Sequence, residues 1–485
     1  MAQCHKLPLY EKVKTVQNHI KEPFWIVLLV ALMLTVLSFV PTSFTVFGIT
    51  TKPVTMFSDV TYKEEVKIVK VEAPKPVVKP APVGFKDKDS LSFKKGYWPI
   101  EEYAASKQDN LAVFYNALMN AKKKKVHLAF FGDSMIEGDI VTQDLRAMLQ
   151  KRFGGRGVGF VPIINFIPGF RQSIHQSFAD NWTAYTVIED RQPAIPYGLG
   201  GEAFVPSITN DGKAASWASF QGVKQSEGLD SFHVVKLYYS NPNNADAKVF
   251  VKKDGVSTTL PLANGGGLKV LTLNSGKALY SLQMSFMASD KVYVYGASFE
   301  DTTGVYIDDL DMRGSSGQQL SVIDDGIMHQ FQNELNIKCA VLQYGLNVVH
   351  TNTTDYSYYV KGFANTINAL KNKLPQCGIL VNSVSDRAVK KHGGYETMPE
   401  IHDFAAAQQG IAKQTNTAFW NLFQAMGADS SMINMVNSDQ PLANKDYTHF
   451  KPMGGSCIAS YFYYSMLYDY ERYEWDYIQK KNGHS

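Results

Sequence analysis

VHLAFFGDSMIEGD, residues Val126–Asp139, decides the fold of this chain of 485 residues. Its first half is a short apolar run, as expected of a strand buried in the middle of a parallel sheet. A strand followed by a helix indicates the first βα unit of an α/β domain. The helix is predicted beyond the GDS turn, where apolar side chains recur at helical spacing: Ile140, Val141, Leu145, Met148, Leu149 and Phe153.

Later stretches repeat this pattern of an apolar strand and an amphipathic helix. Repeated βα units predict a parallel sheet with helices on both faces. The further strands are expected at VYIDDL (Val305–Leu310), CAVLQYG (Cys339–Gly345), GILVNSV (Gly378–Val384) and AFWNLF (Ala418–Phe423), and the helices at Val322–Leu335, Tyr358–Leu374 and Phe404–Lys413.

The middle of the chain has a different pattern. Helical periodicity disappears from Val161 to Glu300, and short β-prone runs such as FHVVKLYYS (Phe232–Ser240) alternate with turns rich in Asn, Gly, Asp and Ser. We therefore expect an all-β module, residues 161–302, inserted into an α/β domain formed by residues 96–160 and 303–485.

Composition excludes several classes of function. A formal net charge of +3 gives no broad basic surface, so nucleic acid is not an expected partner. The four cysteines form no CxxC or Cys/His cluster at zinc spacing, and we expect neither a metal nor another cofactor. Cys339 and Cys377 each begin a predicted parallel strand, so they either pair across neighbouring strands or stay as free buried thiols.

The N-terminal region indicates a membrane anchor. Pro23–Val40 carries no charge and is long enough to cross a bilayer core of ~30 Å at ~1.5 Å rise per residue. A cleaved signal peptide and a buried helix are the alternatives, but bulky residues follow the segment where a signal peptide has small ones. Four lysines precede it and only Lys52 follows closely, which places residues 1–22 in the cytoplasm. We expect the anchor at 23–45 and a Pro/Lys-rich spacer at 46–95.

Ser134 lies where this fold can position a nucleophile. A serine at a strand-to-helix turn presents its hydroxyl to a substrate carbonyl, and backbone N–H groups at the start of the helix point at the developing oxyanion. Taken alone, a Gly-Asp-Ser triplet is more often a turn with a helix cap. The interpretation therefore depends on partners elsewhere in the chain.

Two such partners occur in DYTH (Asp446–His449), a polar loop before the last long helix. The spacing of three residues lets the carboxylate fold back onto Nδ1–H of the imidazole, which leaves Nε2 to take the serine proton. Two more segments follow predicted strands. RGSSG (Arg313–Gly317) has a glycine N–H that can approach a substrate, and GLN (Gly345–Asn347) has a carboxamide that can donate into the crevice at the carboxyl ends of the strands.

These four segments, GDS, RGSSG, GLN and DYTH, resemble in order the four sequence blocks of the SGNH hydrolases, also called GDSL esterases. The resemblance covers Val126–Ile163 and Thr303–Tyr473, and it implies a flavodoxin-like, three-layer α/β/α fold. The chain departs from the pattern in two places: Met-Ile-Glu follows the serine, and the second block lacks the usual Asn ahead of its glycine.

The resemblance also implies roles for individual residues. Ser134 is the expected nucleophile, His449 its general base and Asp446 the partner that orients the base. The expected oxyanion hole consists of the Ser134 N–H, the Gly317 N–H, preferred over that of Gly314, and the Asn347 side chain.

A narrower similarity is to bacterial peptidoglycan O-acetylesterases, in which a β-sandwich carbohydrate-binding module interrupts the hydrolase domain. FGGRGVGFVPI (Phe153–Ile163) carries it. It implies an acetylated envelope polysaccharide as substrate and, with the anchor, a single-pass protein of the bacterial inner membrane with its catalytic domain in the periplasm. A polysaccharide O-acetyltransferase with the same triad and a non-catalytic glycan-binding protein are the alternatives. The sugar, the acyl group and the oligomeric state stay open.

Three other features have two interpretations each. The run Lys122–Lys125 either attracts an anionic glycan or forms a solvated helix end. Trp182, Tyr185 and Trp217 either stack on sugar rings or pack in the core of the β module. His350, close to Asn347, either contacts substrate or is a loop histidine without a role.

Overall fold

The structure, a computed structural model, falls into two units, Met1–Leu91 and Ser92–Ser485. In the first unit it describes the pairing of β1 (Thr45–Val46) with β2 (Ile49–Thr50). The expected anchor, 23–45, and spacer, 46–95, lie almost wholly outside the described residues. Within the described part of the chain, no helix is both long enough and apolar enough to cross a membrane. The described residues are 25, 28, 29, 32, 45, 46, 49, 50, 98–105, 110–167, 169–189, 191–209, 213–224, 228–391 and 393–481.

A six-stranded sheet forms the centre of the second unit. Its first five strands are parallel, and their chain order, second, first, third, fourth, fifth, is that of a flavodoxin-like sheet. The strand at Lys125–Gly132 is buried along its length except at its first residue, which explains its apolar sequence. The order across the sheet is β16 (Gly304–Asp311), β4 (Lys125–Gly132), β17 (Ile337–Gln343), β18 (Gly378–Asn382), β21 (Ala418–Trp420) and β3 (Ile100–Glu102).

The predicted α/β class is therefore confirmed, with one correction to the parallel sheet. Strand β3 pairs with β21 in antiparallel fashion, so the sheet is mixed. Strand β3 precedes the first βα unit and lies at the edge of the sheet, so the βα repeat that makes the other five strands parallel does not fix its direction.

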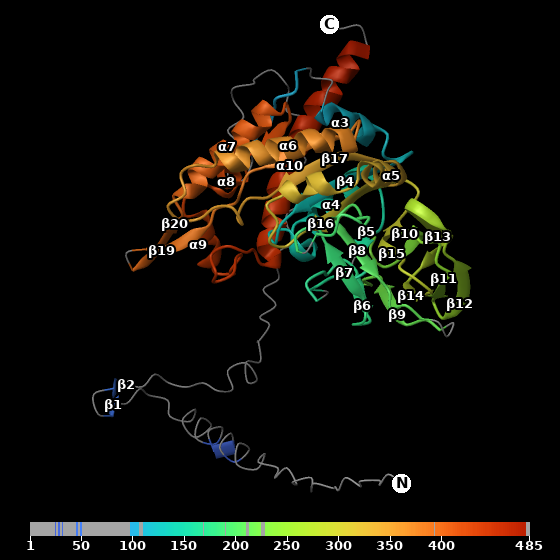
Figure 1. Cartoon of the computed structure of the whole chain (residues 1–485). Helices are drawn as coiled ribbons and strands as arrows, with labels where there is room; N and C mark the ends of the chain where they lie inside the picture. Colours follow the sequence, from blue (N-terminus) through green and yellow to red (C-terminus); the bar gives the residue numbers. More distant parts are fainter. Residues whose placement is uncertain are drawn as a thin grey trace, which may run out of the picture. The chain divides into compact units, whose positions relative to one another are not determined.

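Helices cover both faces of this sheet (Figure 1). Those on one face pack against α10, the long last helix, and those on the other pack against α6. The first layer consists of α3 (Leu111–Met119), α4 (Thr142–Phe153) and α10 (Pro452–Lys481), and the second of α5 (Asp325–Leu335), α6 (Ser357–Lys373) and α7 (Glu400–Gln414). Smaller elements near the carboxyl ends of the strands are the hairpin β19 (Ala388–Lys391) and β20 (Gly394–Thr397), α8 (Leu422–Met426) and α9 (Ser431–Val436).

The insert between α4 and β16 is a pair of antiparallel sheets (Figure 1, green to yellow-green). Phe220 of one sheet and Phe299 of the other lie in one hydrophobic core, with their ring centroids 4.9 Å apart. One sheet consists of β13 (Gly265–Leu279), β10 (Phe232–Asn241), β15 (Tyr293–Glu300), β8 (Glu202–Val205) and β7 (Thr183–Thr186), with β5 (Gly159–Pro162) also on β15, and the other of β12 (Val256–Pro261), β11 (Ala247–Lys253), β14 (Ser281–Ala288), β9 (Ser216–Gln221) and β6 (His175–Phe178). Since β5 belongs to the module, the module begins two residues before the expected boundary at 161.

Buried charged groups join the module to β4 and β16. The ring of His127 lies between two carboxylates, with Nδ1 2.9 Å from Asp308 and Nε2 3.0 Å from Glu300 at the end of β15. Burial opposes ionisation of these groups, yet the two carboxylates raise the pKa of His127, and the ring and Lys125 lower the pKa of Glu300 to about 2. The β module and the α/β domain are therefore joined by a buried contact between charged groups.

Arg171 of the module forms a second such junction, with Asp309 of β16 and with Asp139, which follows the GDS turn. Its side chain is buried and donates to Asp309 on β16 at 3.1 Å, and its guanidinium lies 3.7 Å from Asp139. Asp139 also pairs with Arg146 of α4 at 2.5 Å, and its backbone N–H donates to Asp309 at 2.7 Å. These bonds hold Asp139 at φ 67°, a left-handed conformation that a non-glycine residue adopts only when its surroundings fix it.

Candidate active site

Ser134, His449 and Asp446 come together beyond the carboxyl end of β4. Ser134 Oγ lies 2.9 Å from His449 Nε2, and His449 Nδ1 lies 2.8 Å from Asp446 Oδ2. Ser134 is half-buried, while the side chains of His449 and Asp446 are 37% and 48% exposed. The arrangement can move a proton from the serine hydroxyl to the imidazole, with the carboxylate holding the ring, in contact with solvent.

The loop that carries His449 is fixed by its own backbone. The N–H groups of Thr448 and His449 donate to Asp446 Oδ1 at 2.9 and 3.1 Å. Partial burial acts to raise the pKa of Asp446, but these bonds and the His449 ring outweigh it and hold the pKa below its usual value. The carboxylate therefore stays ionised at neutral pH.

Two glycines let the start of α10 pack closely, Gly455 against the segment after the serine turn and Gly454 against the segment before the histidine loop. A Cβ on Gly455 would lie 2.0 Å from the carbonyl oxygen of Ile140, and one on Gly454 would lie 2.0 Å from that of Leu442. Both contacts are with backbone, which cannot swing aside. The distance between the serine turn and the histidine loop is thus fixed by close contacts between backbone atoms.

The turn at Ser134 differs from the expected helix start. Ser134 lies in a turn closed by the Ile136 N–H to Asp133 O bond at 3.2 Å, a 3₁₀ segment covers Glu137–Asp139, and α4 begins only at Thr142. Gly138 (φ 69°) and Asp139 (φ 67°) have left-handed backbone conformations, which interrupt the helix between the serine turn and α4. The backbone N–H groups beside Ser134 therefore belong to a turn and not to the first turn of an α-helix.

Asn347 lies at the end of β17, as expected, but both hydrogens of its carboxamide are occupied. Nδ2 donates to Asp133 Oδ2 at 3.2 Å and to the carbonyl oxygen of Ser315 at 3.0 Å. This orientation is well determined, because a flipped amide would place its oxygen against two acceptors. The side chain reaches the site but holds no free donor in this state.

The N–H of Gly317, also expected in the oxyanion hole, is occupied as well: it donates to Ser315 Oγ at 2.9 Å within its own turn. The residue has φ 83°, and a Cβ would lie 2.6 Å from both Phe363 and Tyr344, so glycine is needed here for packing. Gly314 (φ 79°) is exposed and has open space around it. Within the described residues, the Ser134 N–H forms no hydrogen bond, and of the three expected donors it is the free one.

Asp133, the middle residue of GDS, is a site residue that the sequence did not single out. It is buried and accepts from the Met135 N–H at 3.0 Å and from Asn347 at 3.2 Å. Burial raises the pKa of its carboxyl to about 6, against the lowering by its backbone donors and the charge of His449. Asp133 thus fixes both the serine turn and the Asn347 carboxamide.

Tyr447, inside DYTH, stacks on Tyr395 of the β19–β20 hairpin, with ring centroids 3.7 Å apart. The Tyr447 carbonyl also accepts from the Ala388 N–H at 3.1 Å. Tyr395 lies more than fifty positions earlier in the chain and has no motif around it, so no sequence signal pointed to it. Its ring is 44% exposed and forms part of the rim beside the histidine loop.

The structure also places the other residues that were singled out in the sequence. Trp182 packs against the core of the β module and donates to Trp217 O at 3.2 Å. His350 is exposed in its loop. Cys339 and Cys377 are free thiols in the structure, and burial raises the pKa of Cys377 to about 12.

Comparison with known proteins adds a likeness of fold. No family model and no curated protein sequence matches this chain. A solved structure described as a peptidoglycan O-acetylesterase in action matches with a TM-score of 0.62 and 22% sequence identity, over 77% of this chain and 99% of that one.

Two further structures match at lower scores. One is an acetyl xylan esterase (TM-score 0.26, 17% identity, 33% of this chain and 80% of that one). The other is a GDSL-like lipase from Bacteroides thetaiotaomicron (TM-score 0.23, 18% identity, 33% of this chain and 73% of that one). With its strand order, the position of its four motifs and its likeness to the O-acetylesterase, the chain has the fold of an SGNH, or GDSL, hydrolase that a β module interrupts.

Proposed function

We propose that this protein is a serine esterase that removes O-acetyl groups from peptidoglycan or another polysaccharide of the cell envelope. The observation that carries the proposal is the continuous hydrogen-bonded path from Ser134 Oγ through the His449 ring to Asp446. A hydroxyl needs such a base to become a nucleophile at neutral pH.

In the first step, Ser134 Oγ attacks the acetyl carbonyl carbon and its proton passes to His449 Nε2. The tetrahedral intermediate collapses, the bond between the carbonyl carbon and the sugar oxygen breaks, and that oxygen takes the proton from Nε2. In the second step, a water molecule gives a proton to Nε2 and attacks the acetyl-serine. The Oγ–carbon bond breaks, Oγ regains the proton and acetate leaves. Asp446 stabilises the imidazolium in both steps.

The oxyanion of each intermediate needs donors, and Ser134 N–H is the one already free. The bonds that occupy Gly317 N–H and one Asn347 hydrogen both end on Ser315, at its Oγ and its carbonyl oxygen. We infer that substrate displaces these two bonds, because an oxyanion is a stronger acceptor than a hydroxyl or a carbonyl. Asp133 keeps its hold on the Asn347 carboxamide throughout.

Two observations support a hydrolase acting on a carbohydrate ester. The fold is that of a structure described as a peptidoglycan O-acetylesterase, over nearly all of that structure's length. The exposure of His449 and Asp446 lets water reach an acetyl-serine, which favours hydrolysis over transfer to a sugar hydroxyl. The proposed location, outside the cytoplasm on an N-terminal anchor, is supported by the apolar sequence of residues 23–40 alone.

The test measures acetate released from purified O-acetylated peptidoglycan and, in parallel, from acetylated xylan. Wild-type protein should release acetate from at least one polymer, and Ser134→Ala and His449→Gln should release none above the rate without protein. His350→Gln is the matched control, since it changes an exposed histidine outside the relay, and it should keep full activity. Equal activity in Ser134→Ala and wild type would refute the proposal.

A further inference from the structure

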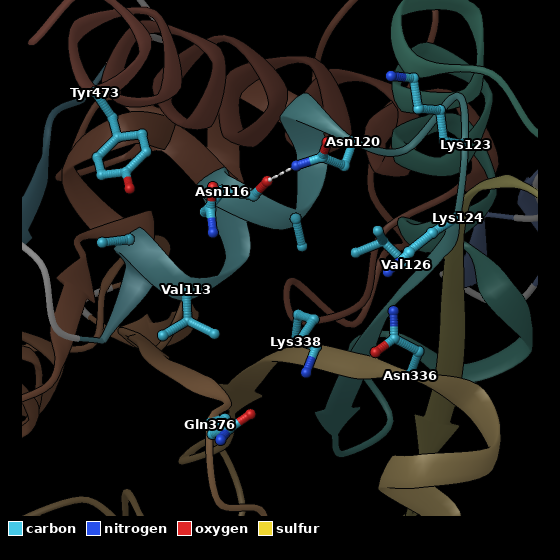
Figure 2. Close-up of a pocket in the computed structure, with 12 residues that line it drawn as sticks. Val113, Asn116, Asn120, Lys123, Lys124, Val126, Asn336, Lys338, Gln376 and Tyr473 are labelled. Atoms are coloured by element: carbon cyan, nitrogen blue, oxygen red, sulfur yellow. Dashed lines mark hydrogen bonds between the residues drawn. The ribbon is translucent and has the colours of Figure 1, made fainter. Parts of the chain in front are cut away.

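A hollow of about 640 Å³ lies at the amino ends of the central strands, under α3 (Figure 2). The labelled side chains in Figure 2 come from α3, from the loop after it and the start of β4, from the start of β17 and the residue before it, from the loop before β18 and from α10, and they surround one space. Its volume falls in the range of ~300–1,000 Å³ that is usual for sites of small ligands.

The hollow is positively charged. Lys123, Lys124 and Lys338 line it, and no carboxylate is among its lining residues. Within the described part of the chain, none of these three lysines forms an ion pair, whereas the next lysine along, Lys125, is paired with Glu300 at 3.0 Å. Unneutralised like charges on the wall of one space repel one another, and an anion bound beside them reduces that repulsion.

The rest of the lining is neutral and combines polar side chains with the apolar Ala112, Val113, Ala117 and Val126. Asn116 and Gln376 are exposed carboxamides on the wall, and the ring of the half-buried Tyr473 forms another side. Carboxamides both donate and accept, which matches sugar hydroxyl groups, and an aromatic ring offers a flat apolar surface to a sugar ring. Gln376, in the loop before β18, has φ 61°, a left-handed conformation that is uncommon for a residue other than glycine.

We propose that this hollow is a second binding site, which takes a carbohydrate that carries an anionic group, a phosphate or a carboxylate. Lysine ammonium groups suit either anion, because they are compact charges that do not require the planar geometry of arginine. Of the run Lys122–Lys125, two lysines serve this site, Lys125 belongs to the junction with the β module, and Lys122 lies outside both.

The site is independent of the proposed esterase reaction. Ser134 follows the carboxyl end of β4 and the hollow lies at its amino end, so the strand Lys125–Gly132 separates them by about 26 Å at ~3.3 Å per residue. A failure of either proposal therefore leaves the other untouched.

The test is calorimetric titration of the full-length chain with glucose 6-phosphate, glucuronic acid and glucose at 50 and 200 mM salt. We expect one or both anionic sugars to bind, glucose to bind at least tenfold more weakly, and affinity to fall at the higher salt concentration, since exposed charges are screened. Binding of one anion but not the other identifies phosphate or carboxylate as the preferred group.

The variants are Lys124→Gln/Lys338→Gln and the matched control Lys122→Gln, which removes a neighbouring exposed lysine outside the lining. The double variant should bind at least tenfold more weakly, and the control as wild type. Thermal melting by circular dichroism checks folding, and Lys123→Gln replaces the double variant if that variant melts early. Unchanged affinity in the variants of lining lysines, or equal binding of glucose, overturns the proposal.

Discussion

Asp446→Asn probes how much of the catalytic rate depends on the carboxylate behind His449. The amide keeps an oxygen that accepts from the Thr448 and His449 N–H groups, so the loop is preserved, but the negative charge beside the ring is lost and an NH₂ donor faces Nδ1 where Oδ2 accepted from it. At the 2.8 Å that separates Nδ1 from Oδ2, two opposite unit charges attract by ~1.5 kcal/mol at a dielectric constant of ~80 and by ~6 kcal/mol at ~20.

The exposure of the pair decides between these limits. Because His449 and Asp446 are 37% and 48% exposed, the interaction is closer to the value in water, and the lost charge should cost ~1.5–3 kcal/mol, a ~10- to ~150-fold fall in kcat. The amide costs more than this, because its NH₂ donates to Nδ1 and holds the ring proton on Nε2, and we expect a total fall of roughly 10³- to 10⁴-fold. Only the part that comes from the lost charge should shrink in 1 M salt, where exposed charges are screened.

The assay is the initial rate of p-nitrophenyl acetate hydrolysis at pH 7.5 in 50 mM and 1 M salt, with Ser134→Ala as the inactive reference. Asp439→Asn, which removes an exposed carboxylate in the preceding segment, is the matched control and should leave kcat unchanged. If Asp446→Asn keeps more than a tenth of the wild-type rate, or if its deficit is the same at both salt concentrations, the reasoning from the geometry and exposure of the pair is wrong.

Three other perturbations test other parts of the structure. Ser315→Ala frees the Gly317 N–H and should raise kcat for p-nitrophenyl acetate by ~2–5-fold, the equivalent of one released hydrogen bond; a tenfold fall would place Gly317 outside the oxyanion hole. Burial, reinforced by Asp311, raises the pKa of Glu202 to about 8, so the folded state binds the extra proton and loses stability as pH rises from about 4.5 to 8. Glu202→Gln should therefore raise Tm more at pH 8 than at pH 5, and an equal rise at both would contradict the assignment. Arg171→Met leaves Asp309 and Asp139 short of a buried partner and should cost ~3–5 kcal/mol in urea unfolding, against ~0–1 for Arg156→Met, which breaks a pair that is over a third exposed; equal costs would show that the junction is not stabilising.

The sequence predicted what depends on pattern. The apolar run at β4 and the helical spacing after it placed the first βα unit, and the order of the motifs brought Ser134, Asp446 and His449 to one edge of the sheet. Each lies in a loop beyond a strand or before α10, and the loops at the carboxyl ends of parallel strands lie close together at one edge of the sheet. The antiparallel β3 was missed because three residues carry no periodicity that shows strand direction.

The sequence did not predict what depends on competition between hydrogen-bond acceptors. Gly317 and Asn347 were assigned as donors from their positions, but Ser315, with one hydroxyl and one carbonyl oxygen, accepts from both in the structure. Ser315 was part of the quoted motif, but the residue type alone does not show which N–H groups its two oxygens accept from. The same holds for Asp133, whose hold on Asn347 at 3.2 Å depends on how β4 and β17 align.

The hydrogen bond between Ser134 and His449 joins residues 315 positions apart in the chain. At a translation rate of ~5–20 residues per second, roughly 15–60 s separate the synthesis of the serine from that of its base. During that interval the ribosome carries a nascent chain whose nucleophile has no proton acceptor, and the β module is completed in between. The path from Ser134 to Asp446 therefore forms only when the histidine loop before α10 has been made and docked, and a product of premature termination before His449 carries a serine without its base.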